Sequence, residues 1–74
     1  MNTPTPRQVE VLAAYVVTGS YKCAAEDLGI QYSTVRNHLL TLRMRLGVQT
    51  THQAIYILTA RGLLVIPGVA RRRA

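Results

Sequence analysis

The spacing of apolar residues in the stretch STVRNHLLTLRMRLGV, residues 33–48, leaves little choice of local structure. Four aliphatic side chains follow one another at intervals of four, three and four positions, which places them on one face of an α-helix: Val35, Leu39, Leu42 and Leu46. Gly47 interrupts the pattern. The stretch therefore predicts an amphipathic helix over about residues 32–46, with its apolar face against a core.

Helix start and stop signals divide the rest of the chain into three further segments. Thr5, Pro6 and Gln8 form a helix start of the capping-box type, and Gly19 ends that helix. A shorter helix is predicted in residues 20–29, where Ser20 is the N-cap and Gly29 ends the helix. Residues 50–62 begin with a second capping box and end at Gly62. No convincing strand is visible. The pattern predicts an all-α fold, a four-helix bundle in residues 1–64, followed by a basic C-terminal tail in residues 65–74.

Charge is distributed unevenly along the chain. Residues 1–27 hold three acids and two bases, which gives −1, whereas residues 28–74 hold seven arginines and no acid, which gives +7 and the total of +6. A surface helix usually mixes acidic with basic residues, so a helix with only positive charge indicates a polyanionic partner. The alternative is a merely basic, well-solvated surface.

Residues 21–40 combine the requirements of a helix-turn-helix motif, in which two helices meet across a turn of about four residues. Ala25 is small, as is required where the second helix crosses close to the first, and Gly29 relieves backbone strain at the turn between them. Ile30 and Val35 fill the wedge between the helices. Each feature alone is weak evidence, but the set at these separations is fairly specific.

Beyond this motif, the segments TPRQVEVL, YKCAAEDLGI, STVRNHL, RLGV and QAIYILTARGLL resemble the DNA-binding domain of the LuxR/GerE (NarL/FixJ-like) family of bacterial transcription regulators, without a gap over residues 4–64. The resemblance implies that the third helix enters the major groove, that the fourth, about residues 52–61, is a dimer contact, and that two subunits read an inverted repeat. The chain departs from the family pattern at Gln8, at Thr18 and at Gln31, which replaces the usual Ser cap of the recognition helix and leaves open a start at Tyr32 or at Ser33.

The predicted recognition helix supplies most of the expected DNA contacts. With its aliphatic stripe turned inward, six side chains are expected to project outward: Ser33, Thr34, Arg36, Asn37, Leu40 and Arg43. Arginine can bind guanine and asparagine can bind adenine in a bidentate way, and an aliphatic side chain suits the thymine methyl group. Arg45 is expected either to bind phosphate or to stabilise the helix dipole, and Lys22 resembles a phosphate contact of the family.

The fourth helix has apolar side chains on more than one face. Ala54, Ile57 and Leu58 are expected to face the core, which leaves Ile55, Tyr56 and Thr59 for a partner helix. We therefore expect a homodimeric, stand-alone transcription regulator that binds double-stranded DNA in a sequence-specific way. The alternatives are a protein-interaction module that contacts RNA polymerase or a sigma factor, and an architectural or recombination-associated DNA-binding protein.

Other classes of function lack the residues that they require. Cys23, His38 and His52 do not have metal-ligand spacing, no Ser/His/acid set is apparent, and we expect neither an enzyme nor a bound metal or cofactor. Cys23 is expected to be a half-buried small side chain. No apolar run approaches the ~20 residues of a membrane span, and the first residues do not form a signal peptide, so we expect a cytoplasmic, nucleoid-associated protein.

Overall fold

The computed structural model describes residues 3–64 and contains four α-helices in that range: α1 (Pro6–Thr18), α2 (Tyr21–Leu28), α3 (Tyr32–Leu46) and α4 (Thr51–Ala60). No strand occurs in the described residues. The predicted all-α class is confirmed, and the predicted bounds of α3 agree with the observed ones. Helix α4 lies one residue earlier than expected, and the predicted tail, residues 65–74, falls outside the described residues.

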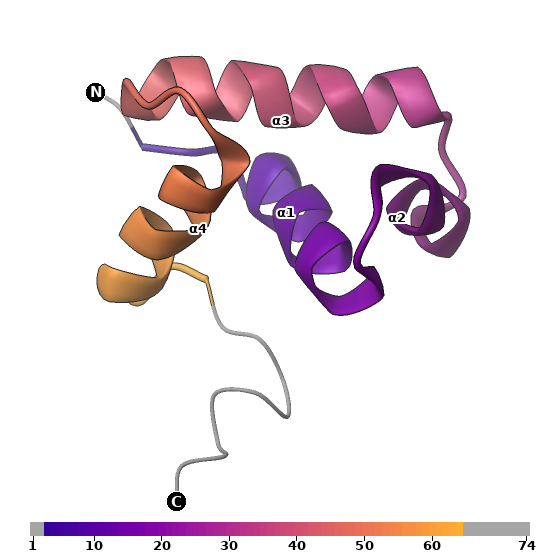
Figure 1. Ribbon diagram of the computed structural model, residues 1–74, viewed down its shortest axis with the longest axis horizontal. Coiled ribbons are helices and arrows are strands. Elements are labelled where there is room, and N and C mark those ends of the chain that lie inside the picture. Colours follow the sequence, from indigo (N-terminus) through magenta and orange to yellow (C-terminus); the bar gives the residue numbers. More distant parts are fainter. Residues whose placement is uncertain (1–2, 65–74) are drawn as a thin grey trace, which may run out of the picture.

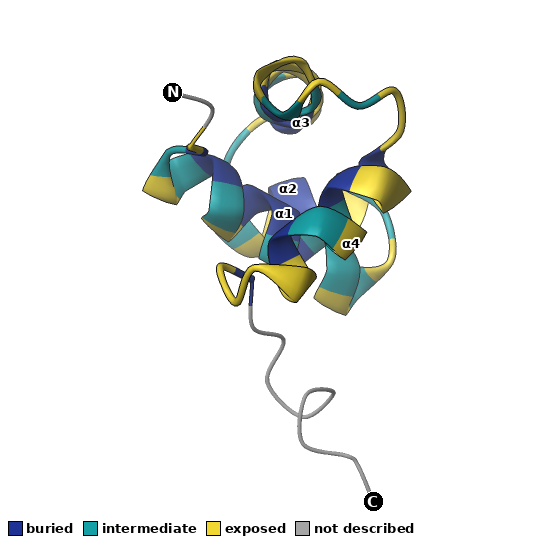
Figure 2. Cartoon of the chain, turned by 90° about the vertical axis from the view of Figure 1, so that its left-hand side faces the viewer, coloured by how far each residue is buried: buried dark blue, intermediate teal, exposed yellow. Residues whose placement is uncertain are grey.

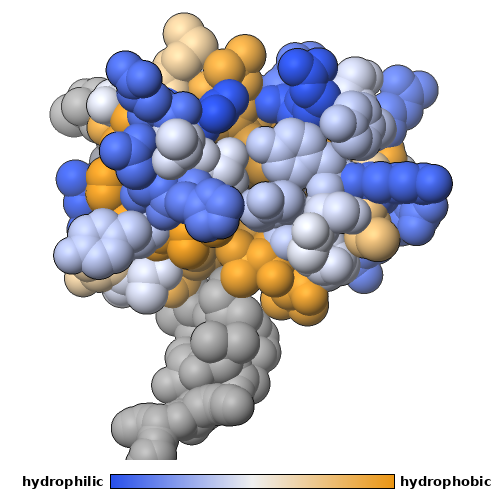
Figure 3. All heavy atoms as spheres, in the orientation of Figure 1, coloured by the Kyte–Doolittle hydropathy of each residue, from blue (hydrophilic) through white to orange (hydrophobic). Residues whose placement is uncertain are grey.

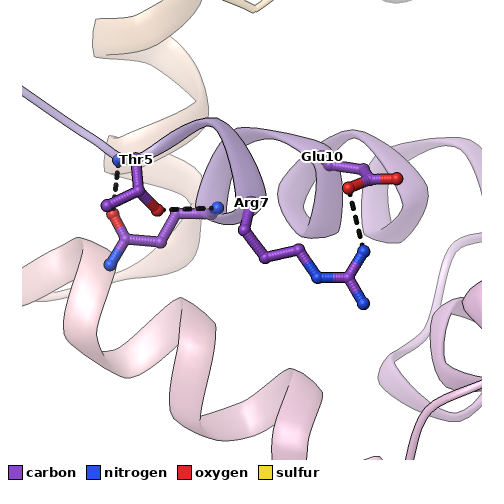
Figure 4. Close-up of polar contacts among 4 residues, drawn as sticks. Thr5, Arg7 and Glu10 are labelled. Carbon is purple, nitrogen blue, oxygen red and sulfur yellow. Dashed lines mark hydrogen bonds and ion pairs between the residues drawn. The ribbon is translucent and has the colours of Figure 1, made fainter.

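Side chains of the expected types cap three of the four helices. At the start of α1, the Thr5 hydroxyl accepts a hydrogen bond from the Gln8 amide at 3.1 Å, and Gln8 Oε1 accepts one from the Thr5 amide at 3.0 Å (Figure 4). The same reciprocal pair, Thr50 and Gln53, opens α4, and Ser20 caps α2. Each bond satisfies an amide that the helix itself leaves without a partner. An exposed ion pair between Arg7 and Glu10 at 2.8 Å adds little to stability (Figure 4).

Glycines in the left-handed conformation end α1, α2 and α3, as the sequence predicts. Gly47, for example, has φ of 71°, and the amide of the next residue donates back to Arg43 O. Helix α4 differs, because its C-cap is Arg61 with φ of −86°, and Gly62 adopts its positive φ only one residue later. Gly62 therefore follows the end of α4 rather than making the cap itself.

Helix α3 is the longest element and lies across the ends of the other three (Figure 1). It packs on α1, α2 and α4, while α1 also packs on α2. Viewed along the axis of α3, its buried side faces these helices and its opposite side is exposed (Figure 2). All four helices contribute to the single buried cluster, which is completed by Leu64: Val11, Leu12, Ala14, Ala24, Ala25, Val35, Leu39, Leu42, Ala54 and Leu58.

Tyrosines join the helices at the edge of this core. The rings of Tyr15 in α1 and Tyr21 in α2 meet edge to face with centroids 5.0 Å apart. The Tyr21 hydroxyl lies 3.3 Å from the Thr51 hydroxyl in the first turn of α4. These contacts fix α1 and α2 relative to α4, so that the three helices form a common base for α3.

The apolar faces of α4 differ from the prediction at two positions. Ala54 and Leu58 are fully buried, as expected, but Ile55 is also packed against the core cluster. Ile57, expected in the core, is half-buried and lines a groove on the outer side of the helix. Helix α4 packs mainly on α3, and Ile55, rather than Ile57, lies on the flank of α4 that meets the core cluster.

Candidate nucleic-acid interface

The exposed side of α3 presents one row of side chains along most of its length. Asn37, Leu40, Thr41 and Met44 are all exposed and stand at positions i, i+3, i+4 and i+7, which lie on one helix face. Ser33 extends the row by one turn toward the helix start. Leu40 and Met44 are apolar and nevertheless 46% and 72% exposed. Apolar spheres accordingly stand among hydrophilic ones along the upper edge of the molecule, where α3 runs (Figure 3).

The three arginines of α3 occupy different environments. Arg36, in the first half of the helix, is exposed. Arg43 is half-buried, and its Nη1 donates a hydrogen bond to Gln49 O at 3.2 Å, in the loop before α4. Arg45 Nη1 donates to Thr3 O at 3.1 Å, so it ties the N-terminal segment to α3 although its side chain is exposed. Arg36 is therefore the arginine of α3 whose side chain makes no hydrogen bond or ion pair within residues 3–64.

A polar recess lies beside the start of this row. It has a volume of about 260 Å³ and is lined by residues of α1 and α3: Gln8, Thr34, Asn37, His38 and Thr41. Thr34 and His38 are half-buried there, so they stand at the edge of the outer face rather than on it. The N-cap of α3, Gln31, makes no side-chain capping bond. Helix α3 nevertheless begins at Tyr32, which excludes the later start at Ser33.

A second surface lies on the outer side of α4. Residues of this helix and of the loop before it line a largely apolar groove of about 440 Å³: Val48, His52, Gln53, Tyr56 and Ile57. Tyr56 is 74% exposed, more than any other large hydrophobic residue of the described chain. Thr59 is also exposed but does not line this groove. We refer to the groove lined by Val48, His52, Gln53, Tyr56 and Ile57 as the α4 groove.

Comparison with known proteins identifies the family. The model of bacterial regulatory helix-turn-helix proteins of the lysR family matches residues 6–63, which include all four helices. The chain belongs to this family. Among curated protein sequences, none matches it.

As a lysR-family helix-turn-helix protein, the chain is a DNA-binding transcription regulator, and its partner is double-stranded DNA. The family consists of regulators rather than enzymes. The resemblance to LuxR/GerE proteins was right about the helix-turn-helix class and wrong about the family that the comparison identifies. Ala25, Gly29, Ile30 and Val35 lie within the segments of that resemblance, but they meet the geometric needs of any helix-turn-helix, so they do not separate one family from another.

Among the predicted DNA contacts of this lysR-family protein, six are exposed: Lys22, Ser33, Arg36, Asn37, Leu40 and Arg45. Thr34 and Arg43 do not project freely, because Thr34 lines the recess against α1 and Arg43 is drawn toward the loop before α4. The sequence interpretation missed Thr41 and Met44, which share the outer face with Asn37. Extending the helical spacing from Asn37 by four and seven residues would have found both.

Three other expectations about this lysR-family chain concern sites and membranes. Cys23 is exposed, not half-buried, because it lies on the outer side of the short helix α2. No group of three or more His, Cys, Asp or Glu side chains in the described part of the chain could hold a metal ion. Among residues 3–64, no helix has the length and apolar character needed to cross a bilayer.

Proposed function

We propose that the chain regulates transcription by placing the outer face of α3 in the major groove of a specific DNA site. The exposure of this face carries the proposal, since the core covers the opposite side of the helix and leaves the row from Ser33 to Met44 uncovered. The described part of α3 and α4 contains no acidic residue that would repel phosphate. A protein that binds chromosomal DNA in this way acts in the bacterial cytoplasm, associated with the nucleoid.

Different side chains take different roles in this proposal. Lys22, at the start of α2, and Ser33, at the start of α3, contact phosphate and set the register of the helix. Arg36 binds a guanine through its O6 and N7 atoms, and Asn37 binds an adenine. Arg45 adds positive charge at the far end of the row, although its hydrogen bond to Thr3 O limits its reach.

The proposed active form is a homodimer that reads an inverted repeat. Its support is the α4 groove, which is largely apolar and in which Tyr56 is exposed and Ile57 is half-buried. A two-fold axis beside α4 would let each Tyr56 pack into the groove of the other copy. Ile55 is not part of this contact, since it packs against the core. Thr59 is left at its edge.

Selection of bound duplexes from a random pool, followed by titration of Arg36 variants, tests the proposal. Arg36→Ala is expected to weaken binding to the selected site by about 5- to 150-fold, because a bidentate contact to guanine contributes ~1–3 kcal/mol. Arg36→Lys is expected to behave like Arg36→Ala at the guanine, because an ammonium group does not reproduce the planar fork. Arg61→Ala, which removes an exposed arginine at the end of α4, is the matched control.

The salt dependence distinguishes base contacts from phosphate contacts. When the logarithm of the binding constant is plotted against the logarithm of the salt concentration, each phosphate contact contributes about −0.9 to the slope. The slope is expected to be steep for the wild type, unchanged in Arg36→Lys, and reduced by about one in Lys22→Ala. Full affinity in Arg36→Ala would contradict the assignment of Arg36. A flat salt dependence with no selected site would favour the rival function, a module that contacts RNA polymerase or a sigma factor.

A further inference from the structure

The apolar side chains in the exposed row of α3 are not explained by the fold. Leu40 and Met44 are four residues apart, so their side chains are neighbours on the helix surface, yet neither is buried by the protein. Single exposed aliphatic residues are common on any surface. Here, however, two of them occupy the middle and the end of the face that the proposed function places against DNA.

The spacing of the row indicates how α3 would meet the duplex. In the homeodomain, a three-helix variant of the helix-turn-helix, the recognition helix reads the major groove through residues at i, i+3, i+4 and i+7, the spacing of Asn37, Leu40, Thr41 and Met44. At ~1.5 Å per residue, Asn37 and Met44 are about 10 Å apart along the helix axis. This distance corresponds to about three base-pair steps at ~3.4 Å each. Since none of the other helices in residues 3–64 covers the outer side of α3 at either end, its whole length can follow the groove (Figure 1).

We infer that Leu40 and Met44 read thymine methyl groups, so that the centre of each half-site is rich in A·T pairs. This inference rests on the proposed function and adds to it both Met44, as a residue that determines specificity, and the orientation of α3. In the major groove, only thymine presents a methyl group, and apolar side chains contact it favourably. Asn37 selects adenine at one end of the row, and the Thr41 side chain, which has both a hydroxyl and a methyl group, is compatible with either A·T orientation.

Charge supports DNA rather than a protein as the occupant of this apolar pair. Arg36 lies on one flank of the row and Arg45 on the other, and no acidic residue occurs from Leu28 to Leu64. Apolar side chains with a positive charge on either flank match a groove whose floor carries methyl groups and whose walls carry phosphates. An acid-free apolar patch for a protein partner would not need arginines on both sides.

The test replaces thymine by deoxyuridine, which removes only the methyl group. The selected duplex is substituted one thymine at a time, and binding of the full chain is measured by fluorescence anisotropy. Two positions in each half-site are expected to lose about fourfold in affinity, the effect of one buried methyl group. Met44→Ala is expected to become insensitive to deoxyuridine at one of these positions, and Leu40→Ala at the other, while Met44→Leu retains the wild-type response.

Val17→Ala is the matched control, because Val17 is an apolar residue that is 62% exposed on α1 and lies away from the row. It is expected to respond to each deoxyuridine as the wild type does. If a site is selected but no deoxyuridine changes the affinity by more than twofold, or if Met44→Ala responds like the wild type, the inference is wrong while the proposed function stands. That result would mean that only the N-terminal end of α3 reaches the bases. If no sequence is enriched over non-specific DNA, the proposed function itself fails.

Discussion

Helices α1 and α4 both begin with a capping box formed by a threonine and a glutamine. The two glutamines differ in burial, so the contribution of burial to stability can be measured within one protein. Gln8 is 4% exposed at the start of α1, whereas Gln53 is exposed at the start of α4. Each side chain accepts a hydrogen bond from the amide of its capping threonine, at 3.0 and 3.1 Å. The perturbation is the same in both places, replacement of Gln by Ala.

The expected effects follow from these environments. Gln8→Ala removes a hydrogen bond worth ~1 kcal/mol and a buried methylene worth ~0.8 kcal/mol, and it leaves a void beside α3, so the free energy of unfolding falls by about 2–3 kcal/mol. Gln53→Ala removes a cap whose amides water can reach, and we expect a loss of about 0.5–1 kcal/mol. For a chain of this length, 1 kcal/mol shifts the Tm by ~4–8 °C. The two variants should therefore melt roughly 8–24 °C and 2–8 °C below the wild type.

Thermal unfolding followed by far-ultraviolet circular dichroism measures both values. Gln53 also lines the α4 groove, so each variant is melted at two protein concentrations, and any contribution from association appears as a concentration dependence of the Tm. Equal losses in the two variants, or a larger loss in Gln53→Ala after this correction, would refute the argument that burial of Gln8 decides the difference. Gln8→Ala is also expected to weaken DNA binding, because Gln8 lines the recess that ends at Asn37.

Two further predictions concern association and helix packing. Tyr56→Glu is expected to sediment as a monomer at concentrations where the wild type is a dimer, since it places a charge in the α4 groove. Val17→Glu, which places the same charge at an exposed apolar position on α1, should remain a dimer, and a dimeric Tyr56→Glu would exclude α4 as the contact. Ala25→Leu is expected to lower the free energy of unfolding by about 1–3 kcal/mol, because Ala25 is 5% exposed where α2 packs on α3. The Tm of this variant should fall, whereas the Tm of Ala60→Leu, a substitution at an exposed position, should not.

The sequence predicted the helices well because their determinants are local. A cap such as Thr5 with Gln8 acts within four residues, and Gly47 stops α3 through its own backbone conformation. The four-three-four spacing identified Val35, Leu39 and Leu42 as core residues for the same reason, since the period of one helix decides which side chains share a face. These features require no knowledge of where other helices lie.

The errors occur at the flanks of the helices, where neighbouring elements decide the outcome. Arg43 lies close to the core face of α3, and only the position of the following loop gives its guanidinium the carbonyl of Gln49 as a partner. The bond from Arg45 to Thr3 O joins residues 42 positions apart, which no local pattern predicts. Ile55 packs against the core cluster and Ile57 lines the α4 groove, the reverse of their expected roles, because the spacing within α4 leaves both at its flanks and only the packing of the helices decides which flank meets the core.

The placement of the arginines explains how a helix can be fixed by the fold and still presented to DNA. Arg43 binds the loop before α4, and Arg45 binds the segment before α1, so two segments outside α3 are attached to its C-terminal half. Neither bond neutralises the charge, since both acceptors are carbonyl oxygens, and the positive potential of the helix is retained. The attraction of α3 for a polyanion therefore comes from all three arginines. The selection of bases, in contrast, depends on the side chains that the fold leaves free: Arg36 at the flank, and the row from Asn37 to Met44.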